Sequence, residues 1–319
     1  MTAATAKLKI VLAPPSKAGD AAFKVLTWGM AMMAFVLVAL VGWELFKGSK
    51  LSLQKFGWSF LLHDWDPGNG TFGALPFIFG TFVSSLLGLL IALPLSLATA
   101  IYLTELAPRW VRQPAMALIE MLAAIPSVIL GLWGIYVLVP WLRDHPYPML
   151  QRLFAWLPVF QGHIYGQCIL SAAVIVAIMI VPIITSMTRE VFRMVPDSQR
   201  EAAFALGATR WEVTWLAVLK GSGRGVFGAA MLGLGRALGE TMAVTMVIGN
   251  STDLSASLFA PGSTLASAIA NQFSEAVDDT YRSALFELGL VLLLVTIVTN
   301  ILAHALIGAV SAPKEAGHA

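Results

Sequence analysis

Six apolar runs, each long enough to cross a lipid bilayer as a helix, restrict this chain more than any other feature. A hydrocarbon core about 30 Å thick needs about 20 apolar residues of helix. The runs that meet this length are Val25–Phe46, Ala74–Leu103, Ala115–Val139, Gln167–Met187, Gly225–Gly249 and Ala284–Val310. We therefore predict an all-α fold, a polytopic transmembrane helix bundle with six spans.

The composition supports a membrane protein and disfavours several other classes. Charged residues make up 12% of the chain, against about 25% in a soluble protein, and the mean hydropathy is +0.79. So few charges cannot cover a water-facing surface. The net charge of +2 gives no reason to expect a nucleic acid partner. The single cysteine, Cys168, excludes an internal disulfide, and the histidines have no ligand spacing, so we expect no metal site.

Lysine and arginine residues are distributed unevenly between the loops. With the N-terminus in the cytoplasm, the inner side carries about twice as many of them as the outer side, as the positive-inside rule requires. We therefore predict an N-in, C-in topology, with a cytoplasmic N-terminal tail at 1–24 and a C-terminal tail at 311–319. The first transmembrane helix, 25–46, exceeds the apolar core of a cleaved signal peptide, so we expect an uncleaved anchor. An outer loop follows at 47–73.

The loop between the fourth and fifth apolar runs predicts two short helices. In a capping box, a hydroxyl and a carboxylate three residues later satisfy the first amides of a helix. Two such patterns occur in the loop, Ser198 with Glu201 and Thr209 with Glu212. Gly207 lies between them, where a helix end favours a left-handed residue. We predict a helix at about 199–206, a sharp turn, and a second helix at about 210–219.

Four side chains in this loop are too apolar for a free cytoplasmic segment: Phe204, Leu206, Trp211 and Trp215. Apolar residues on a short helix suit insertion into the groove of a partner protein. They would also suit packing onto the chain's own helix ends, and the residues alone leave both possibilities open. A DNA-binding helix-turn-helix is disfavoured, because the loop is tethered between two spans and is only mildly basic.

The sequence Glu201-Ala202-Ala203, followed by Gly207, resembles the EAA motif of permeases in ABC-type importers. In that family the loop is a coupling helix that sits in a cleft of the ATP-hydrolysing subunit. The resemblance implies a permease transmembrane domain at 74–310 with a cytoplasmic EAA coupling loop at 189–221. It assigns the ATPase contact to six residues, Glu201, Ala202, Ala203, Phe204, Gly207 and Arg210. This chain has Lys220 where the motif usually has proline.

Arg236 and Glu240 lie inside the fifth apolar run, four residues apart. This spacing places them on one helix face, about 6 Å apart along the axis. Because a charge within a bilayer is costly, it should face the bundle interior and have a partner. The two charges could simply neutralise each other. Alternatively, Arg236 contacts an anion in transit through its planar fork of donors, which matches phosphate oxygens, and Glu240 tempers that attraction.

The segment around this pair resembles the PstC-type permeases of phosphate-specific ABC transporters. It reads Gly235-Arg-Ala-Leu-Gly-Glu-Thr-Met-Ala-Val. Stretches at 72–81, 120–134 and 265–276 are similar to other segments of the same family. The resemblance implies that inorganic phosphate is the transported ion and that the substrate pathway includes Arg236, Glu240 and Thr241.

The resemblance also implies partners. A paralogous, PstA-like permease would complete the pore, and a PstB-like ATPase dimer would bind ATP and Mg. A periplasmic, PstS-like phosphate-binding protein would deliver the anion to the outer loops. This chain has no G-x-x-x-x-G-K-[ST] sequence, so we expect no cofactor and no enzyme activity in the chain itself. We expect contact with membrane lipid and a location in the bacterial inner membrane.

Alternative functions remain at this stage. A permease for another oxyanion, such as sulfate or molybdate, would share the same loop and bundle. An ion-coupled secondary transporter would use Arg236 and Glu240 for proton or ion coupling. That class leaves the EAA-like loop unexplained, and the internal repeat that many such transporters carry is not evident. A signalling membrane protein would need an output domain, which the short tails do not provide.

Overall fold

The computed structural model describes residues 17–311, and within that range the chain is helical, with two isolated β-bridges and no strand. The chain divides into two units, 1–47 and 48–319. The predicted tails at 1–24 and 311–319 lie mostly outside the described residues.

The first unit is a single long helix, α1, Lys17–Gly48. It is long and apolar enough to cross a membrane over Gly19–Gly48. Apolar side chains occur on all of its sides, which is the pattern of a helix surrounded by lipid. The predicted first span, 25–46, lies within it.

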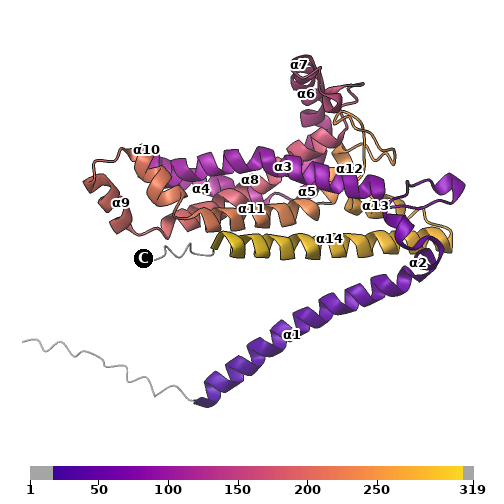
Figure 1. Ribbon diagram of the computed structural model, residues 1–319, viewed down its shortest axis with the longest axis horizontal. Helices are drawn as coiled ribbons and strands as arrows, with labels where there is room; N and C mark the ends of the chain where they lie inside the picture. The colour runs from indigo at the N-terminus through magenta and orange to yellow at the C-terminus, as the bar shows by residue number, and fades with distance from the viewer. Residues whose placement is uncertain (1–16, 312–319) are drawn as a thin grey trace, which may run out of the picture. The chain divides into compact units, whose positions relative to one another are not determined.

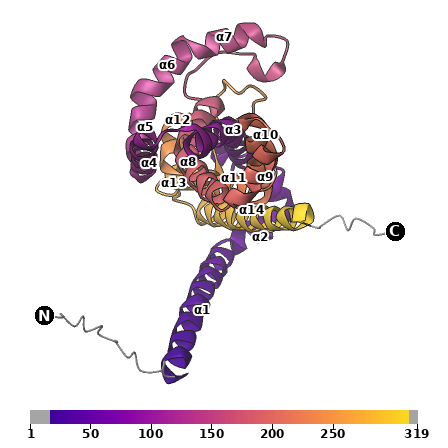
Figure 2. The same ribbon diagram turned by 90° about the vertical axis from the view of Figure 1, so that its left-hand side faces the viewer.

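The second unit is a bundle built around α8, Ile169–Arg193. Packed against α8 are α3, Leu75–Ile101, α4, Arg109–Ala124, and α11, Gly223–Leu238. The last helix, α14, Asp279–Ser311, packs against α11. Figure 1 shows these helices running side by side, and Figure 2 shows the same bundle nearly end-on.

α8 is central because it is apolar on almost every side. Of its most apolar stretch, 72% is buried, against 22% for that of α14. α11 approaches α8 through small residues, as the spacing of Ala229 and Gly233 permits. A Cβ atom added to Gly233 would lie 2.6 Å from Cδ1 of Ile184. This contact fixes which face of α11 is turned toward the core.

The N-terminal end of α8 is closed by a loop rather than by side-chain caps. The first amides of a helix have no acceptors within the helix. Here they donate to carbonyl oxygens of the segment 247–260, Cys168 to Val247 at 3.1 Å, Ile169 to Ala260 at 3.2 Å and Leu170 to Leu258 at 3.1 Å. Of the short helices in this region, α12, Met242–Val247, packs against α8, α13, Leu265–Gln272, packs against α12 and α3, and α2, Lys50–Phe56, packs against α14.

The predicted third span, 115–139, is wrong as a single helix. α4 ends at Ala124, and Ile125 is extended before Pro126. Proline disfavours the helical conformation of the residue before it and lacks an amide donor, so the helix ends there. The chain continues through α5, Ser127–Trp133, a π-helix, Gly134–Leu138, α6, Val139–Asp144, and α7, Pro146–Leu153.

The predicted fifth span, 225–249, is also wrong as a continuous helix. α11 ends at Leu238 and α12 begins at Met242, so residues 239–241 form a break. Gly239 is a poor helix former. The Glu240 carboxylate accepts the N–H of Ala243 at 3.4 Å. A side chain thus replaces the main-chain acceptor that a continuous helix would supply.

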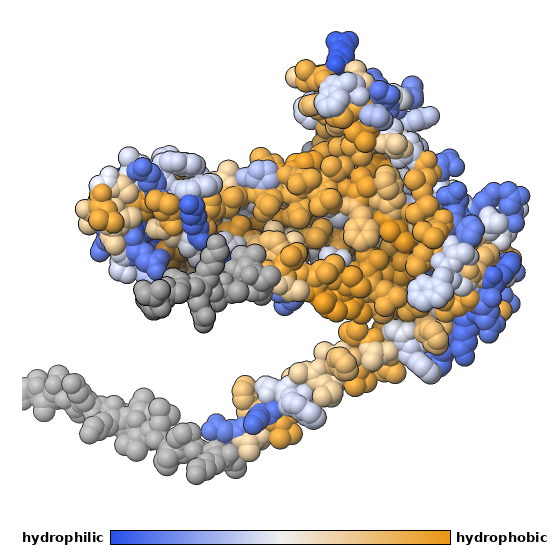
Figure 3. All heavy atoms as spheres, viewed as in Figure 1, coloured by the Kyte–Doolittle hydropathy of each residue, from blue (hydrophilic) through white to orange (hydrophobic). Residues whose placement is uncertain are grey.

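Five of the described helices are long and apolar enough to cross a membrane. Figure 3 shows apolar residues along the middle of the bundle and polar residues gathered at its two ends. The chain is therefore a multi-pass membrane protein. The six-span, N-in, C-in topology stays a prediction, because two of the expected spans are interrupted.

Candidate functional site

The loop after α8 forms two short helices, as the sequence predicts. α9 spans Asp197–Ala205 and α10 spans Arg210–Val213. Between them Gly207 has a φ of 84°. This is the left-handed conformation, which glycine adopts without a steric penalty. The reversal of direction between the two helices therefore depends on this glycine.

Only one of the two predicted capping boxes forms. The Thr209 hydroxyl accepts the N–H of Glu212, whose carboxylate accepts the Thr209 N–H at 2.7 Å. The backbone hydrogen bond from Thr209 holds the pKa of Glu212 below its usual range. The box at Ser198 is wrong. α9 already begins at Asp197, directly after Pro196, so Ser198 lies inside the first turn.

The second helix of the loop continues from α10 as a π-helix, Thr214–Leu219. The N–H of Lys220 donates to the carbonyl oxygen of Trp215 at 3.0 Å and closes its last turn. Proline, which the motif usually has here, lacks an N–H and could not make this bond. The segment 210–219 is thus helical over its predicted length, but its hydrogen bonding changes type.

The apolar residues of this loop face outward. Leu206 is 90% exposed and Trp211 is 66% exposed, and Phe204 and Trp215 are also exposed. The rings of Trp211 and Trp215 stack with their centroids 5.9 Å apart. These exposures disfavour the alternative in which the side chains pack back onto the chain's own helix ends. An exposed apolar patch bordered by polar residues is typical of a protein interaction site.

The other predicted ATPase-contact residues are also accessible. Glu201, Ala202 and Arg210 are exposed, and Ala203 is half-buried. A cavity of about 260 Å³ lies beneath the loop and is lined in part by Phe204 and Arg210. The loop therefore offers an apolar and a charged surface together at the polar end of the bundle.

Arg200 attaches α9 to the ends of the long helices. Its guanidinium donates to the carbonyl oxygens of Phe192 and Val195, at 2.9 and 2.6 Å, where α8 ends. It also pairs with Glu105 at 3.1 Å. Glu105 lies on the π-helix Tyr102–Leu106, which follows α3. Both side chains of the pair are largely buried, so water screens this pair less than a surface pair.

Arg236 lies just before the break between α11 and α12, and Glu240 lies within it. Arg236 is in the last turn of α11 and Glu240 precedes α12, so each charge is near the helix end whose dipole it complements. The Arg236 Nη2 atom lies 3.8 Å from Oε2 of Glu240, beyond hydrogen-bond distance. The Glu240 side chain is 7% exposed, whereas that of Arg236 is 48% exposed. The guanidinium therefore has donors available for another group.

Thr241, the third predicted pathway residue, completes the break. Its hydroxyl donates to the carbonyl oxygen of Gly239 at 3.3 Å, and its carbonyl oxygen accepts from the Thr245 hydroxyl at 2.7 Å. Both bonds are local, so in this structure Thr241 supports the backbone of the break beside Glu240.

The face of α11 that carries Arg236 is open. A Cβ atom added to Gly228 or Gly235 would meet no atom within 4 Å, and Leu232 is exposed. A charged side chain at the depth of a membrane bundle is costly in contact with lipid. We therefore infer that another protein chain or a water-filled path covers this face.

The sequence analysis missed two buried or largely buried carboxylates. Glu105 pairs with a residue 95 positions further along the chain, and no local pattern could have indicated it. Glu287, on α14, is buried next to α2. Its position inside the sixth apolar run was the available signal, since an ionisable residue in a membrane span needs a partner or a polar environment.

Comparison with known families and proteins agrees with this architecture. The family model described as "Binding-protein-dependent transport system inner membrane component" matches residues 92–312. The phosphate transport system permease protein PstC of Pasteurella multocida is 48% identical over 290 residues, which cover 89% of this chain and 90% of that protein. PstC of Xylella fastidiosa (strain Temecula1) is 49% identical and covers 87% of each chain. The probable PstC of Methanocaldococcus jannaschii is 37% identical over 88% of this chain and 91% of its own length.

Among solved structures, an inward-facing MetNI methionine ABC transporter contains a chain of similar fold. It has a TM-score of 0.52 and 18% sequence identity, and the match covers 75% of this chain and 94% of that chain. At this identity the similarity concerns the fold alone, and it agrees with an ABC permease bundle.

Proposed function

This chain belongs to the family of binding-protein-dependent transport system inner membrane components, and we propose that it is the PstC-type permease subunit of a phosphate ABC transporter. The observation that carries the proposal is its identity of 45–49% with proteins named PstC, over at least 86% of both chains. Such relatives are transport permeases and not enzymes themselves. The sulfate, molybdate and secondary-transporter alternatives have no support from these relatives.

In this role, Arg236 would contact phosphate in the translocation pathway. Its side chain is half exposed, lies on the open face of α11 and is only loosely paired with Glu240. A guanidinium matches phosphate oxygens in shape and charge. Glu240, held in place at the start of α12, would limit the affinity of Arg236 for the anion and so permit its release. Thr241 would support the backbone that holds both charges.

The pathway would form between this chain and a second permease. The described residues of the unit 48–319 do not cover the open face of α11, and a paralogous, PstA-like permease would supply that cover. A PstB-like ATPase dimer would bind ATP and Mg, and a PstS-like binding protein would deliver phosphate from the periplasm. In this proposal the complex would lie in the bacterial inner membrane.

Coupling would run through α9 and α10. Phe204 and its exposed neighbours would insert into a groove of the ATPase, with Glu201, Ala202, Ala203, Gly207 and Arg210 forming the rest of the contact. Closure of the ATPase dimer on ATP would move this loop, and Arg200 would pass the movement to α8 and α3. ATP drives such a change because it binds the two states with different affinity.

The test is uptake of labelled phosphate by cells that lack other high-affinity phosphate import. The native chain is compared with Arg236→Ala at equal membrane levels, in the presence of the partner subunits, and sulfate is added as a competitor. Arg143→Ala, which removes an exposed arginine in α6, is the matched control.

We expect the native chain and Arg143→Ala to take up phosphate without competition from sulfate, and Arg236→Ala to lose most uptake. Absence of phosphate uptake by the native chain would overturn the assignment of substrate. Normal uptake by Arg236→Ala would leave the assignment intact, but would show that the pair is structural and that another residue contacts the anion.

A further inference from the structure

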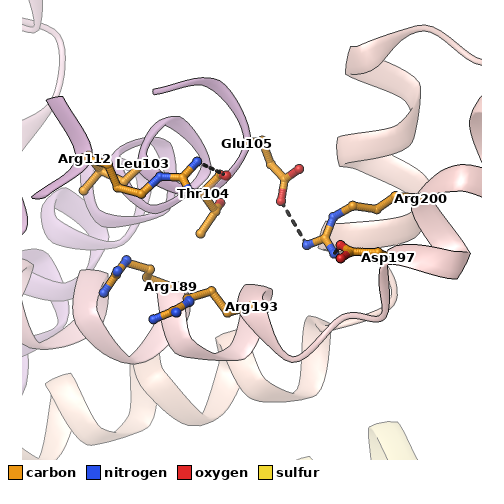
Figure 4. Close-up of a pocket in the computed structure, with 8 residues that line it drawn as sticks. All are labelled: Leu103, Thr104, Glu105, Arg112, Arg189, Arg193, Asp197 and Arg200. Atoms are coloured by element: carbon orange, nitrogen blue, oxygen red, sulfur yellow. Dashed lines mark hydrogen bonds and ion pairs between the residues drawn. The ribbon is translucent and has the colours of Figure 1, made fainter. Parts of the chain in front are cut away.

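A second basic site lies at the end of the bundle that carries α9, apart from the Arg236–Glu240 pair. It is a cavity of about 340 Å³ between the π-helix Tyr102–Leu106, α4, α8 and α9. Figure 4 shows side chains from all four elements around one space. The charged residues that line it are Arg112, Arg189, Arg193, Arg200, Glu105 and Asp197.

The two carboxylates that line this cavity both pair with the same arginine. Both lining carboxylates pair with Arg200, each at 3.1 Å. Arg189 and Arg193 share a single oxygen of Glu190, at 3.2 and 3.3 Å. Arg112 has hydrogen bonds only to main-chain carbonyl oxygens within the described part of the chain. Three arginines therefore lie at one cavity with one shared carboxylate between them.

Two of these arginines also carry buried donors without acceptors. The Nε–H groups of Arg112 and Arg189 are buried and have no hydrogen-bond partner among the described residues. Buried donors in folded proteins are nearly always paired. Missing acceptors beside an excess of guanidinium groups are what an anion with several oxygens would satisfy, and the oxygens of a phosphate group match the guanidinium fork.

A larger neighbouring cavity, of about 650 Å³, continues from the first. It shares Arg112, Arg189 and Arg193, and adds Arg109 together with the apolar side chain of Met116. Its one carboxylate is Glu120. The two cavities together thus offer a cationic centre with an apolar flank.

The position along the bundle agrees with a phosphate site at the membrane surface. Two membrane-length helices, Leu75–Leu106 and Ile169–Arg193, end here. Basic pockets between membrane helices at the cytoplasmic face are places where phosphate-containing lipid headgroups bind.

We propose that the arginine pocket, formed by Arg112, Arg189 and Arg193, binds a phosphate group, carried by an anionic phospholipid or present as free phosphate. Arg200 lines the same cavity and holds α9. A bound phosphate group would therefore tie α9 to α4 and α8 and stabilise the attachment of the coupling loop. The proposal does not depend on which anion the chain transports.

The test uses the chain in the complex with its partners, purified in nanodiscs of zwitterionic phosphatidylcholine. Two probes are titrated separately, phosphatidylglycerol as a fraction of the nanodisc lipid and inorganic phosphate in the buffer, and the midpoint of thermal unfolding is recorded. The test variant is Arg193→Gln, since that side chain is 59% exposed and pairs only with Glu190 three residues away. Arg282→Gln is the matched control, because Arg282 is 50% exposed and has the same spacing to Asp279.

We expect at least one probe to raise the unfolding midpoint of the native complex and of Arg282→Gln. In Arg193→Gln about tenfold more of that probe should be needed, since one charge-assisted contact is lost. A response to phosphatidylglycerol alone identifies a lipid headgroup site, a response to inorganic phosphate alone identifies a free-phosphate site, and a response to both identifies a site for the shared group. The proposal is overturned if neither probe raises the midpoint, or if Arg193→Gln responds as the native complex does.

Discussion

Arg236 and Glu240 show how single residues are made compatible with a membrane bundle. Each charge lies at the end of a helix segment with a favourable dipole, and the break between the segments leaves the guanidinium half exposed. Arg200 follows a related principle, since it donates to the carbonyl oxygens at the end of α8. Glu240 and Arg200 thus each satisfy main-chain groups that a helix end leaves open, Glu240 at the start of α12 and Arg200 at the end of α8.

Replacement of Glu240 by glutamine should remove the charge of this side chain and keep its hydrogen bond to the main chain. Glutamine keeps an oxygen that can accept the Ala243 N–H, so the start of α12 should persist. Without the negative charge, Arg236 should hold phosphate more tightly. We therefore expect maximal uptake to fall about tenfold or more, which corresponds to about 1.4 kcal/mol, at an unchanged membrane level. Labelled-phosphate uptake over a range of concentrations measures this.

Two results would contradict that expectation. Unchanged maximal uptake by Glu240→Gln would show that the carboxylate does not govern release. A loss of the protein from the membrane would show that the charge mainly stabilises the fold.

Replacement of Glu105 by glutamine should loosen the attachment of α9. The negative charge of a largely buried pair with Arg200 is lost, at a cost of about 1 kcal/mol, because the glutamine oxygen can still accept a hydrogen bond but a neutral acceptor binds the guanidinium more weakly than a carboxylate. The bonds from Arg200 to α8 remain. We expect the complex to form and hydrolyse ATP while phosphate uptake per ATP falls several-fold. The measurement is the ratio of uptake to hydrolysis in proteoliposomes. Glu44→Gln, in an exposed pair with Lys47, is the control, and an unchanged ratio in Glu105→Gln would refute the role of this pair in coupling.

At the scale of elements, the loop that contains α9 and α10 combines rigid attachment with an exposed apolar surface. The left-handed Gly207, the Thr209–Glu212 capping box and the π-helix closed by Lys220 fix its shape. Its apolar side chains nevertheless have no cover within the described part of the chain. An element that is ordered but uncovered suits a partner that binds it without first having to fold it.

A substitution at the most exposed apolar residue of this loop tests whether the patch is a docking surface. Leu206→Ser should leave the stability of the chain within about 0.5 kcal/mol, since the side chain packs on nothing. We expect co-purification of the ATPase to fall at least several-fold. Val277→Ser, at an equally exposed position in the loop before α14, is the control and should retain the ATPase. Equal recovery of the ATPase with both variants would exclude Leu206 from the interface.

At the scale of the whole molecule, α8 organises the bundle. It is buried along most of its length and contacts α3, α4 and α11. Its N-terminal end is closed by main-chain hydrogen bonds to the segment 247–260. The C-terminal end of α8 and the neighbouring α4 carry the arginine pocket. The attachment of α9 lies at the same end of the bundle, between α8 and the π-helix that follows α3. A displacement of one end of α8 can therefore be transmitted to its other end through a packed helix rather than through a flexible loop.

The single cysteine reports on this closure. Cys168 is fully buried at the start of α8, with its sulfur 3.5 Å from the Ser171 hydroxyl oxygen and 3.8 Å from that of Tyr147. We expect a maleimide to label the native protein no faster than the protein unfolds, since the thiol has no access to solvent. Leu62→Cys in a Cys168→Ala background, an exposed position, should react within the mixing time. Comparable labelling rates at the two positions in the native state would show that the N-terminal end of α8 is not closed to solvent.

The sequence by itself determined the class of the protein and the helical nature of its elements, and it predicted the residues of the coupling loop and of the Arg236–Glu240 pair. Long apolar runs specify membrane helices because lipid offers no alternative partners for the backbone. The turn at Gly207 and the box at Thr209 were predictable because the groups involved lie within three residues of each other.

Only the tertiary structure decided where the long helices break and which distant residues meet. Pro126 is a local signal for a break, but Pro94 and Pro182 lie inside the continuous helices α3 and α8, so a proline alone does not show where a helix ends. The break at Gly239 falls inside an apolar run that is long enough to cross a bilayer as one helix. The pair between Glu105 and Arg200 joins residues 95 positions apart, and the cavity that contains the arginine pocket is lined by side chains from four elements. The open face of α11 follows from its packing on α8. These features depend on which surfaces the neighbouring helices leave uncovered, and a local pattern of residues does not contain that information.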